Sequence, residues 1–271
     1  MGYVEIHLDE KLDLKTVAEA AHYSKYHLHR MFTKTVGMTL HDYIQRRRLS
    51  EAAKYLAFSR KPLLEIALIA GYESQQAFTG VFKAMYKQTP LEYREKGAFY
   101  PLQSAFTLNR DPSAPEVVIR NIAYAAVGDI PDWMEFISLV IDGFPCLDRA
   151  RHLKRLRRYV EQRQALLARD KEIMVGAAAF SPQTGRIDFL GIHPQYRRHG
   201  IAEAFLDRIR RNEFRDREVS VTTFREGDKA DTGQRAAYRR LGFAESELLT
   251  EFGYPVQRLV LRTDWEGVSD E

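Results

Sequence analysis

The most constraining feature of this 271-residue chain is a repeat within its N-terminal third. Apolar residues at helical spacing form two short segments around a turn, and the pattern recurs 49 residues later, or 50 after one inserted residue. The repeat predicts two helix-turn-helix units in tandem. The matched residues are Val17, Ala18, Ala21, Tyr23, Ser24, Leu28 and Phe32 in the first copy, and Ile66, Ala67, Ala70, Tyr72, Ser74, Phe78 and Phe82 in the second.

The residues at the two turns indicate how each turn is made. The hydroxyl of Ser24 can accept from the first free amides of the next helix, which makes it a natural N-cap. Gly71 stands at the turn of the second copy where the first copy has His22. Such a position often needs a positive φ, which glycine adopts freely and histidine adopts at some cost. We therefore expect left-handed backbone at both turns.

The net charge of +4 lies entirely in the same third of the chain. Residues 1–96 hold 15 Lys and Arg against 11 Asp and Glu, and the remainder holds 26 of each. In a helix-turn-helix unit, the early residues of the second helix face base edges in the major groove, where Arg suits guanine and Gln suits adenine. Short helix pairs also occur in many helical bundles, but tandem copies with groove-suited residues favour DNA. The candidate DNA contacts are Lys25, Tyr26, His29, Arg30, Gln75, Gln76 and Thr79.

Three stretches resemble the DNA-binding domain of the AraC/XylS family of bacterial transcription regulators. They are Ser24–Phe32, Gly71–Thr79 and Pro90–Arg94, and the resemblance extends over about residues 3–96. It implies that both units enter successive major-groove segments of one double-stranded DNA site, with a long helix at about residues 41–58 between them. The same contact residues follow from the resemblance.

Two positions in this region leave the DNA interface open. Close relatives have Arg where this chain has Gly80, which puts in doubt one base or phosphate contact by the second unit. The triplet Arg46–Arg48 can contact phosphates or face solvent, and the sequence does not decide between them.

Beyond Glu95 the helical periodicity stops and prolines punctuate the chain. We expect an all-α tandem helix-turn-helix domain over residues 1–97, a linker over 98–115 and a second domain over 116–271. Strands and helices alternate in that second domain, which predicts an α/β fold. The expected strands are 117–120, 173–180, 186–193, 218–224, 244–250 and 256–262, and the expected helices are 131–141, 148–168, 198–212 and 231–241.

A strand-to-helix turn in this domain predicts an anion site. The strand ends at His193, a loop carries Arg197 and Arg198, and Gly200 and Ala202 open a helix. Small residues let backbone amides approach a ligand, and the helix N-terminus presents free N–H groups and partial positive charge. The arrangement suits a pyrophosphate.

The pattern Arg197-x-x-Gly200-x-Ala202, with the run Tyr238–Phe243 about forty residues later, resembles the GNAT family of acetyl-CoA-dependent N-acetyltransferases. The resemblance covers about residues 116–262 and implies an acyl-CoA N-acyltransferase fold with a mixed central sheet. It implies acetyl-CoA as cofactor, with the pantetheine arm along residues 189–192 and a backbone N–H near Leu190 that polarises the thioester carbonyl. The implied cofactor contacts are Leu190, Ile192, Arg197, Arg198, His199, Gly200, Ile201 and Ala202.

Two catalytic roles follow from the same resemblance. Tyr238 stands where the family places the acid that protonates the departing thiolate, although a Tyr on such a helix also packs in a core. Asp188 is the one carboxylate of the strand before the loop and is the candidate base, with a surface position as the alternative. Asp231 stands where the family commonly has an Asn before the catalytic Tyr.

The acceptor site should come from the first helices of the domain. No Lys or Arg occurs between residues 121 and 148, while acidic and aromatic residues alternate there. Such walls suit a small cationic amine such as an antibiotic or a polyamine, although acids also simply face water. The substrate candidates are Asp132, Trp133, Glu135 and Phe136, in a segment that also holds Asp129, Asp142, Phe144 and Asp148. A basic helix face follows, with Arg149, Arg151, Lys154, Arg155, Arg157 and Arg158.

Composition excludes several other classes. The single cysteine, Cys146, excludes an internal disulfide and a cysteine-built zinc site, and we expect no metal. No apolar stretch approaches the roughly 20 residues of a membrane span, so we expect a cytoplasmic protein. The leading hypothesis is a DNA-binding regulator fused to an N-acetyltransferase for a small amine. A non-catalytic sensor of acetyl-CoA or another ligand and an enzyme that acetylates protein are the alternatives.

Overall fold

The computed structural model describes residues 1–140, 149–214, 217–251 and 253–261. The chain divides into two compact units. The first comprises Met1–Asp111 with residues 137–140 and Asp228–Thr232, so residues 98–111 of the expected linker pack within it. The second comprises Pro112–Phe136, Arg149–Gly227 and the described residues from Gly233 onward. Asp142, Phe144, Cys146, Asp148 and Arg262, which the sequence analysis names, lie outside the described residues.

The first unit is all-α, as the sequence predicts. Five of its helices begin at a side-chain cap: Asp13, Ser24, Thr39, Ser74 and Thr89 each accept a hydrogen bond from the amide three residues on. The Ser24 cap is thereby confirmed, with 3.2 Å between Oγ and the His27 amide. The helices are α1 (Gly2–Ile6), α2 (Leu14–Ala20), α3 (Lys25–Val36), α4 (Leu40–Phe58), α5 (Leu63–Ile69), α6 (Gln75–Tyr86) and α7 (Pro90–Lys96).

The two helix-turn-helix turns have the same geometry, as the sequence predicts. His22 has φ of 57° and Gly71 has φ of 82°, so both lie in the left-handed region. Each turn closes with a hydrogen bond from a tyrosine amide to an alanine carbonyl five residues earlier, Tyr23 to Ala18 and Tyr72 to Ala67, both 2.9 Å.

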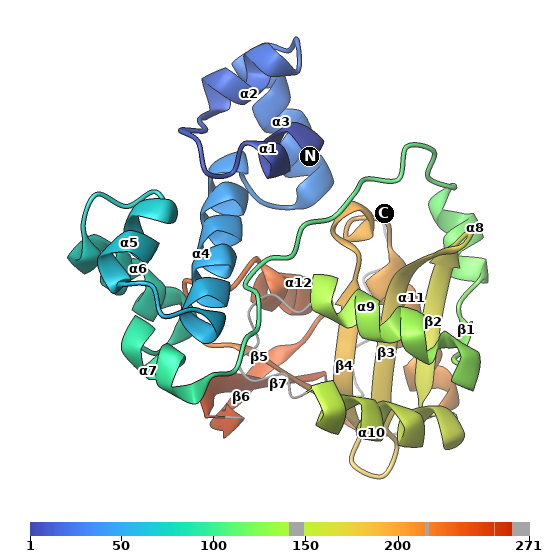
Figure 1. Cartoon of the computed structure of the whole chain (residues 1–271). Helices are drawn as coiled ribbons and strands as arrows, with labels where there is room; N and C mark the ends of the chain where they lie inside the picture. Colours follow the sequence, from blue (N-terminus) through green and yellow to red (C-terminus); the bar gives the residue numbers. More distant parts are fainter. Residues whose placement is uncertain (141–148, 215–216, 252, 262–271) are drawn as a thin grey trace. The chain divides into compact units, whose positions relative to one another are not determined.

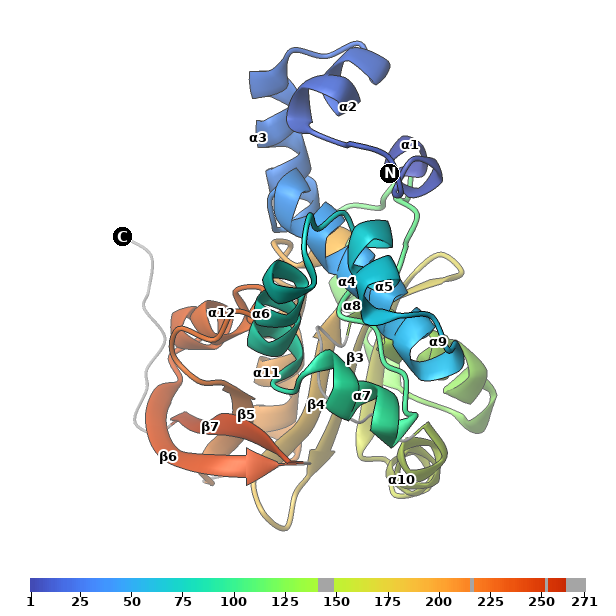
Figure 2. The same cartoon turned by 60° about the vertical axis from the view of Figure 1, so that its left-hand side comes forward.

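Helix α4 belongs to both hydrophobic cores of this unit (Figure 2). Near its start, Tyr43 and Ile44 pack with residues of α2 and α3. Its second half packs Leu49, Ala53 and Leu56 with residues of α5 and α6. The two helix-turn-helix units are therefore built on one continuous helix.

Arg46 and Arg47 of α4 are buried, so both expectations, contact with phosphate and exposure to solvent, are wrong for these two residues, whereas Arg48 is partly exposed. Arg46 and Arg47 are 4% and 8% exposed. Arg47 forms an ion pair with Glu5 (Nη2 to Oε2, 2.9 Å), and Tyr43 donates to the same carboxylate at 2.6 Å. Arg48 donates from Nε to the Leu8 carbonyl at 2.9 Å. A buried guanidinium needs such partners, and the protein supplies them internally.

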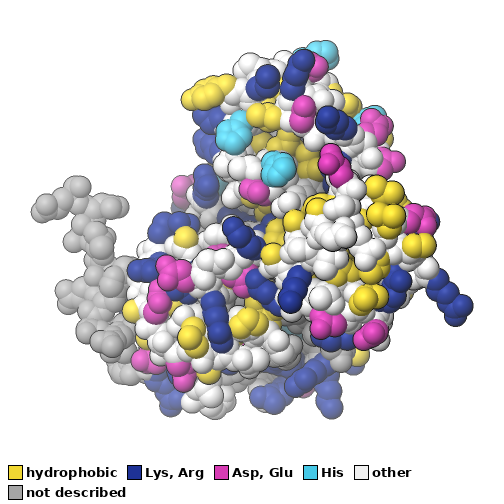
Figure 3. Space-filling model, turned by 90° about the vertical axis from the view of Figure 1, so that its left-hand side faces the viewer, with side chains coloured by type: hydrophobic (Ala, Val, Ile, Leu, Met, Phe, Trp, Pro, Cys, Tyr) yellow, Lys and Arg dark blue, Asp and Glu magenta, His cyan; other side chains and the backbone are white. Residues whose placement is uncertain are grey.

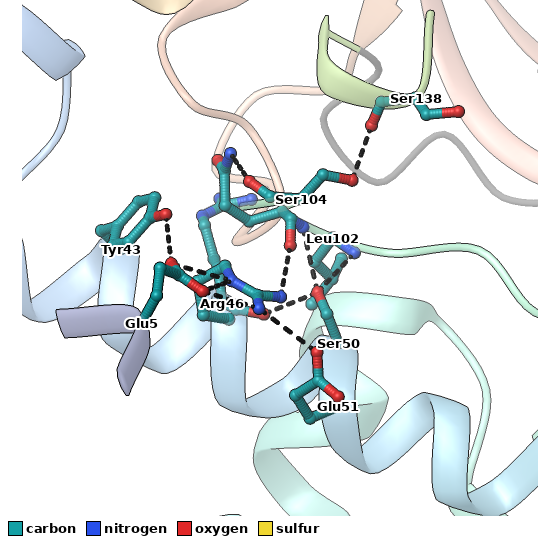
Figure 4. Close-up of polar contacts among 10 residues, drawn as sticks. Glu5, Tyr43, Arg46, Ser50, Glu51, Leu102, Ser104 and Ser138 are labelled. Atoms are coloured by element: carbon teal, nitrogen blue, oxygen red, sulfur yellow. Dashed lines mark hydrogen bonds and ion pairs between the residues drawn. The ribbon is translucent and has the colours of Figure 1, made fainter. Parts of the chain in front are cut away.

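The segment after α7 is fixed to α4 by one hydroxyl (Figure 4). Ser50 Oγ accepts from the amides of Leu102 and Gln103 at 2.9 and 3.0 Å and donates to the Arg46 carbonyl at 2.8 Å. Arg47 Nη1 donates to the Gln103 carbonyl at 3.2 Å. This part of the expected linker is thus ordered on the helix.

The second unit is an α/β domain with a mixed seven-stranded sheet, which confirms the expected fold class. The strand order is β1-β2-β3-β4-β5-β7-β6, and of these neighbours only β4 and β5 run parallel. Helices α9 and α10 lie on one face of the sheet and α8 and α11 on the other (Figure 1). The strands are β1 (Ala123–Tyr124), β2 (Ala165–Asp170), β3 (Ile173–Ser181), β4 (Arg186–Ile192), β5 (Val219–Phe224), β6 (Ala244–Glu251) and β7 (Tyr254–Leu261); the helices are α8 (Pro115–Arg120), α9 (Ile130–Val140), α10 (Arg149–Glu161), α11 (Ile201–Asn212) and α12 (Gln234–Arg240), with 3₁₀ turns η1 (Val127–Asp129) and η2 (Pro194–Tyr196).

Two expected elements are wrong. Residues 117–120 form the end of helix α8 rather than a strand, because Pro115 begins a helical turn. The expected helix 148–168 ends at Glu161, since Arg163 adopts φ of 54°, and the following residues form β2. The run Leu166–Leu167 is buried in the sheet, which periodicity alone does not separate from a buried helix.

Within the described ranges, no helix combines the length and the apolar character that crossing a bilayer requires.

The left-handed turns generate a stability prediction. Gly71→Ala should lower the free energy of unfolding by about 1–2 kcal/mol, because an L-residue is strained at this φ and its Cβ would lie 2.7 Å from the Arg48 guanidinium. His22→Gly at the equivalent turn should instead raise it by up to about 1 kcal/mol. Urea unfolding of both variants checks this pair, and equal losses in both would contradict it.

Candidate functional site

The candidate DNA contacts of the first helix-turn-helix lie exposed on the first half of α3. Lys25, Tyr26, His29 and Arg30 are all exposed, and Tyr26 reaches 74%. The Arg30 guanidinium lies 5.7 Å from the Tyr26 ring centroid, within cation–π distance. This contact favours one orientation of the two side chains. In Figure 3 the His side chains lie on the upper part of the visible face, where Lys and Arg are interspersed with acidic side chains.

The second recognition helix, α6, presents a less charged surface. Gln75 and Gln76 are exposed and Thr79 is partly exposed, while the intervening Phe78 is buried in the core. A Cβ at Gly80 would meet no atom within 4 Å, so this exposed position has room for a long side chain.

In the second unit, β4 and β5 part soon after they meet. The only register pair between them in the described chain is Arg186–Ser220, at the start of β4. Leu190 and Ile192 lie farther along β4, beyond this pair. Parallel strands that separate leave backbone N–H and C=O groups on the facing edge of β4, where an extended ligand can pair.

The helix that follows β4 begins with an uncapped turn. Gly200 is the N-cap of α11, has φ of 71° and provides no side-chain cap. The first amide to bond back is that of Ala204, to the Gly200 carbonyl at 3.0 Å, so the amides of Ile201, Ala202 and Glu203 have no partner within the helix. Ile201 packs its side chain in the core and can contribute only its backbone. This N-terminus suits an anion.

Side chains of the preceding loop support the same interpretation. Arg198 is exposed, whereas Arg197 donates from Nε to the Ile192 carbonyl at 3.3 Å and is thereby tied to the end of β4. His199 Nδ1 is buried and lacks a hydrogen-bond partner among the described residues.

A buried carboxylate that the sequence analysis missed holds this loop. Tyr196 donates to Asp170 Oδ2 at 2.5 Å, and Ser113 donates to Oδ1 of the same carboxylate at 2.5 Å. Burial acts to raise the pKa of Asp170, but the hydrogen bonds from Ser113 and Tyr196 outweigh it and lower the pKa. The three residues are far apart in sequence, so no local pattern reveals them.

Tyr238 of α12 lies in the main core of the second unit at 5% exposure. Its ring is 5.5 Å from that of Phe243 in an edge-on contact. Burial raises the pKa of the phenol well above its usual value, so it stays protonated and able to donate at neutral pH.

Asp188 occupies a β-bulge. Ala179 pairs with Phe189 and Phe180 pairs with Ile187, which leaves Asp188 without a partner across the ladder. Its carboxylate accepts from Ser181 at 2.5 Å and lies 3.5 Å from Arg155 and 3.4 Å from Arg186. The bulge therefore interrupts the two-residue alternation that would otherwise place Asp188 on the face of Leu190 and Ile192.

The acidic residues of the expected acceptor wall are partly neutralised. Arg169 forms ion pairs with Asp129 at 2.8 Å and with Asp132 at 2.6 Å. Glu135 is exposed, while Trp133 and Phe136 are 1% and 4% exposed. No local sequence signal points to Arg169, which follows Asp132 by 37 residues.

His152 of α10 is a half-buried neighbour of the same aromatic residues. Its ring lies 6.4 Å from that of Phe189 on β4, and Trp133 lies 5.9 Å from Phe189. Burial, followed by the charges of Arg155 and Arg149, lowers the pKa of His152 to about 4. The imidazole is therefore neutral at physiological pH.

Comparison with known proteins identifies both units. The family described as helix-turn-helix domain matches residues 17–96, and the acetyltransferase (GNAT) domain family matches residues 144–254. The regulatory protein SoxS of Escherichia coli (strain K12) is 40% identical over 96 residues, which cover 35% of this chain and 90% of that protein. The chain belongs to the AraC family of helix-turn-helix regulators. Its second unit is a GNAT acetyltransferase domain.

Other relatives match over part of their length. The right origin-binding protein of Escherichia coli (strain K12) is 39% identical over 129 residues, or 48% of this chain, and the chain spans only 43% of that protein. A solved GNAT-family acetyltransferase from Bacillus cereus ATCC 10987 has 13% identity, covers 52% of this chain and 96% of its own, and gives a TM-score of 0.42. The assignment of the GNAT domain therefore depends on the family match.

The neutral histidine generates a prediction about pH. The folded chain should protonate His152 near pH 4 and the unfolded chain near pH 6.5, so protonation of this group favours unfolding as the pH falls through that window. An NMR titration of the ring, assigned with His152→Gln, measures the folded value. Arg155→Gln should raise the pKa of His152, because it removes a neighbouring positive charge. A titration midpoint above 6 in the wild type would contradict the claim that burial lowers the pKa of His152.

Proposed function

We propose that this chain is a DNA-binding transcription regulator whose GNAT domain transfers an acetyl group from acetyl-CoA to a small amine. The observation that carries the first part is the pair of exposed recognition helices on one shared helix. The observation that carries the second part is the divergence of β4 and β5 next to the uncapped start of α11.

The spacing of the helix-turn-helix units supports binding of one double-stranded DNA site. The 19 residues of α4 span about 28 Å at 1.5 Å per residue. That length is comparable to one turn of DNA, roughly 34 Å, which separates successive major-groove segments on one side of the duplex. We assign the base-edge contacts to Tyr26 and Arg30 of α3 and to Gln75, Gln76 and Thr79 of α6.

The residues around Gly200 fit acetyl-CoA. The free amides of Ile201 and Ala202 suit the pyrophosphate, together with Arg198 and the unpartnered Nδ1 of His199. The edge of β4 at Leu190 and the Ile192 amide, which β5 does not pair within the described residues, suits the pantetheine amides. When bound, acetyl-CoA supplies the activated acetyl thioester.

Tyr238 is the acid in this proposal. Attack by the neutral amine forms a C–N bond and breaks the thioester C–S bond. Tyr238 gives its phenol proton to the leaving sulfur, the amine releases one proton, and the tyrosinate regains a proton from solvent. The raised pKa of Tyr238 keeps that proton in place until transfer. The Asp188 carboxylate is already engaged by Ser181, Arg155 and Arg186, so we assign the amine proton to solvent.

The same pairing of Asp188 favours a second candidate function. A domain without a free carboxylate base near β4 can bind acetyl-CoA as a signal without turning it over. Thiol release in the presence of amines separates the two functions, because a sensor binds acetyl-CoA and releases no thiol.

Gly80 provides a test of the DNA surface. Gly80→Arg should steepen the dependence of log K on log salt concentration by about 0.9 on mixed-sequence duplex DNA, because one phosphate contact is added. Gly80→Ala is the matched control. It should stabilise α6 by about 1 kcal/mol, as Gly80→Arg does, and leave the salt slope unchanged. Fluorescence anisotropy titrations at several salt concentrations measure both, and an unchanged slope in Gly80→Arg would exclude α6 from the interface.

The assignment of the acid predicts a contrast between two isosteric variants. Tyr238→Phe should lower kcat/KM at least about 100-fold, whereas Asp188→Asn should lower it less than about tenfold. Thiol release at saturating acetyl-CoA measures both. Wild-type turnover in Tyr238→Phe would remove tyrosine from the mechanism, and a loss of more than 100-fold in Asp188→Asn would make the aspartate the base.

A further inference from the structure

A short segment between β5 and α12, Asp228–Thr232, packs within the first unit. Arg46 of α4 is 4% exposed, and its Nη2 donates to the Lys229 and Ala230 carbonyls at 3.2 and 2.9 Å. Ala230 is fully buried. Asp228 Oδ1 accepts from the Ala230 amide at 2.9 Å, which closes the segment into a turn. A buried guanidinium therefore holds the backbone of this segment.

Lys87 at the end of α6 binds the same segment. Its Nζ lies 2.7 Å from the Asp228 carboxylate and donates to the Ala84 carbonyl at 2.7 Å. The Asp228 side chain is only 4% exposed, and a carboxylate buried to this extent is unfavourable unless it is paired. Lys87 supplies the cation of that pair.

The backbone of Lys87 is strained for a residue with a side chain. Lys87 is the C-cap of α6 and has φ of 59°, in the left-handed region that favours glycine. The internal repeat, at its offset of 50, has Gly37 at the equivalent C-cap of α3, with φ of 85°. A glycine at position 87 would relieve the strain but remove the ion pair with Asp228. The buried carboxylate thus accounts for a lysine at this C-cap.

The segment leads directly into the helix of the proposed acid. Gly233 follows Thr232 and is the N-cap of α12, which carries Tyr238. Arg235 fixes one side of the helix, because its Nη1 donates to the Phe224 carbonyl at 3.2 Å. The helix has only 7 residues, so the placement of its first turn also affects the placement of Tyr238. A displacement of about 1 Å at a reacting group can lower a rate about 100-fold.

We propose that Lys87 is a positioning residue for acetyl transfer: with Arg46 it holds Asp228–Thr232 in the first unit and thereby fixes α12, which carries Tyr238. The inference rests on the proposed role of Tyr238 as the acid. Lys87 acts through the helix that follows the segment and not by contact with acetyl-CoA. The helix-turn-helix unit then contributes to catalysis in addition to binding DNA.

Lys87→Gly tests the proposal in the full-length protein, because it removes the ammonium and relieves the strained φ. Spermidine, lysine and phenethylamine serve as probe amines, and thiol release is measured with the fastest. We expect kcat to fall at least about tenfold, while KM for acetyl-CoA changes less than about twofold. Lys87→Arg keeps the positive charge and should restore most of kcat. Lys83→Gln neutralises an exposed lysine of the same helix and is the control, which should match the wild type.

Asp228→Asn removes the same ion pair from the other side and keeps an oxygen for the Ala230 amide. It should lower kcat to a similar extent as Lys87→Gly. The double variant should show no further loss, because both changes break one interaction. Additive losses would mean that the two residues act independently, which contradicts the proposal.

Hydrogen exchange measures the placement of α12 without any turnover. The amides of residues 234–240 should exchange at least about tenfold faster in Lys87→Gly than in the wild type, and those of α11 should not change. Wild-type kcat, or wild-type exchange in α12, in Lys87→Gly overturns this inference and leaves acetyl transfer intact. No thiol release from the wild type with any probe amine overturns the proposed function and this inference together.

Discussion

The first unit depends on the continuity of α4. This helix buries Tyr43 in one hydrophobic core and Leu56 in the other, so neither helix-turn-helix can move without it. Polar side chains of α4 bind other parts of the unit. Arg47 forms an ion pair with Glu5 of α1, and Ser50 accepts a hydrogen bond from the chain after α7. Removing one partner of a buried ion pair is strongly destabilising, because it leaves an uncompensated buried charge. Helix α4 therefore fixes the two recognition helices on one rigid support.

In the second unit the corresponding constraint is the separation of β4 from β5. A single register pair joins them at Arg186–Ser220, and the bulge at Asp188 bends β4 just beyond it. The separation exposes a strand edge, and α11 begins a few residues later with its amides free. The Asp170–Tyr196 hydrogen bond holds the loop between them. One backbone irregularity and one uncapped helix thus leave an unpaired strand edge close to a helix N-terminus, where we propose the anion site.

Much of this could be predicted from sequence, because the decisive signals are local. The repeat, the Ser24 cap and the positive φ at His22 and Gly71 each follow from the type and spacing of adjacent residues. The glycine and arginine spacing likewise identified the second family. The failures involve partners distant in the chain: nothing near Asp132 points to Arg169. Whether a short apolar run becomes strand or helix also depends on tertiary packing, as the ends of α8 and α10 show.

The central claim is that the first turn of α11 is a working coenzyme site. Calorimetric titration of acetyl-CoA into the full-length protein and into Gly200→Val tests it most directly, because valine is strained at φ of 71°. We predict binding in the micromolar range for the wild type and at least tenfold weaker binding for the variant, with duplex DNA binding equal in both. Absence of heat in the wild type, or equal affinity in the variant, would contradict the account.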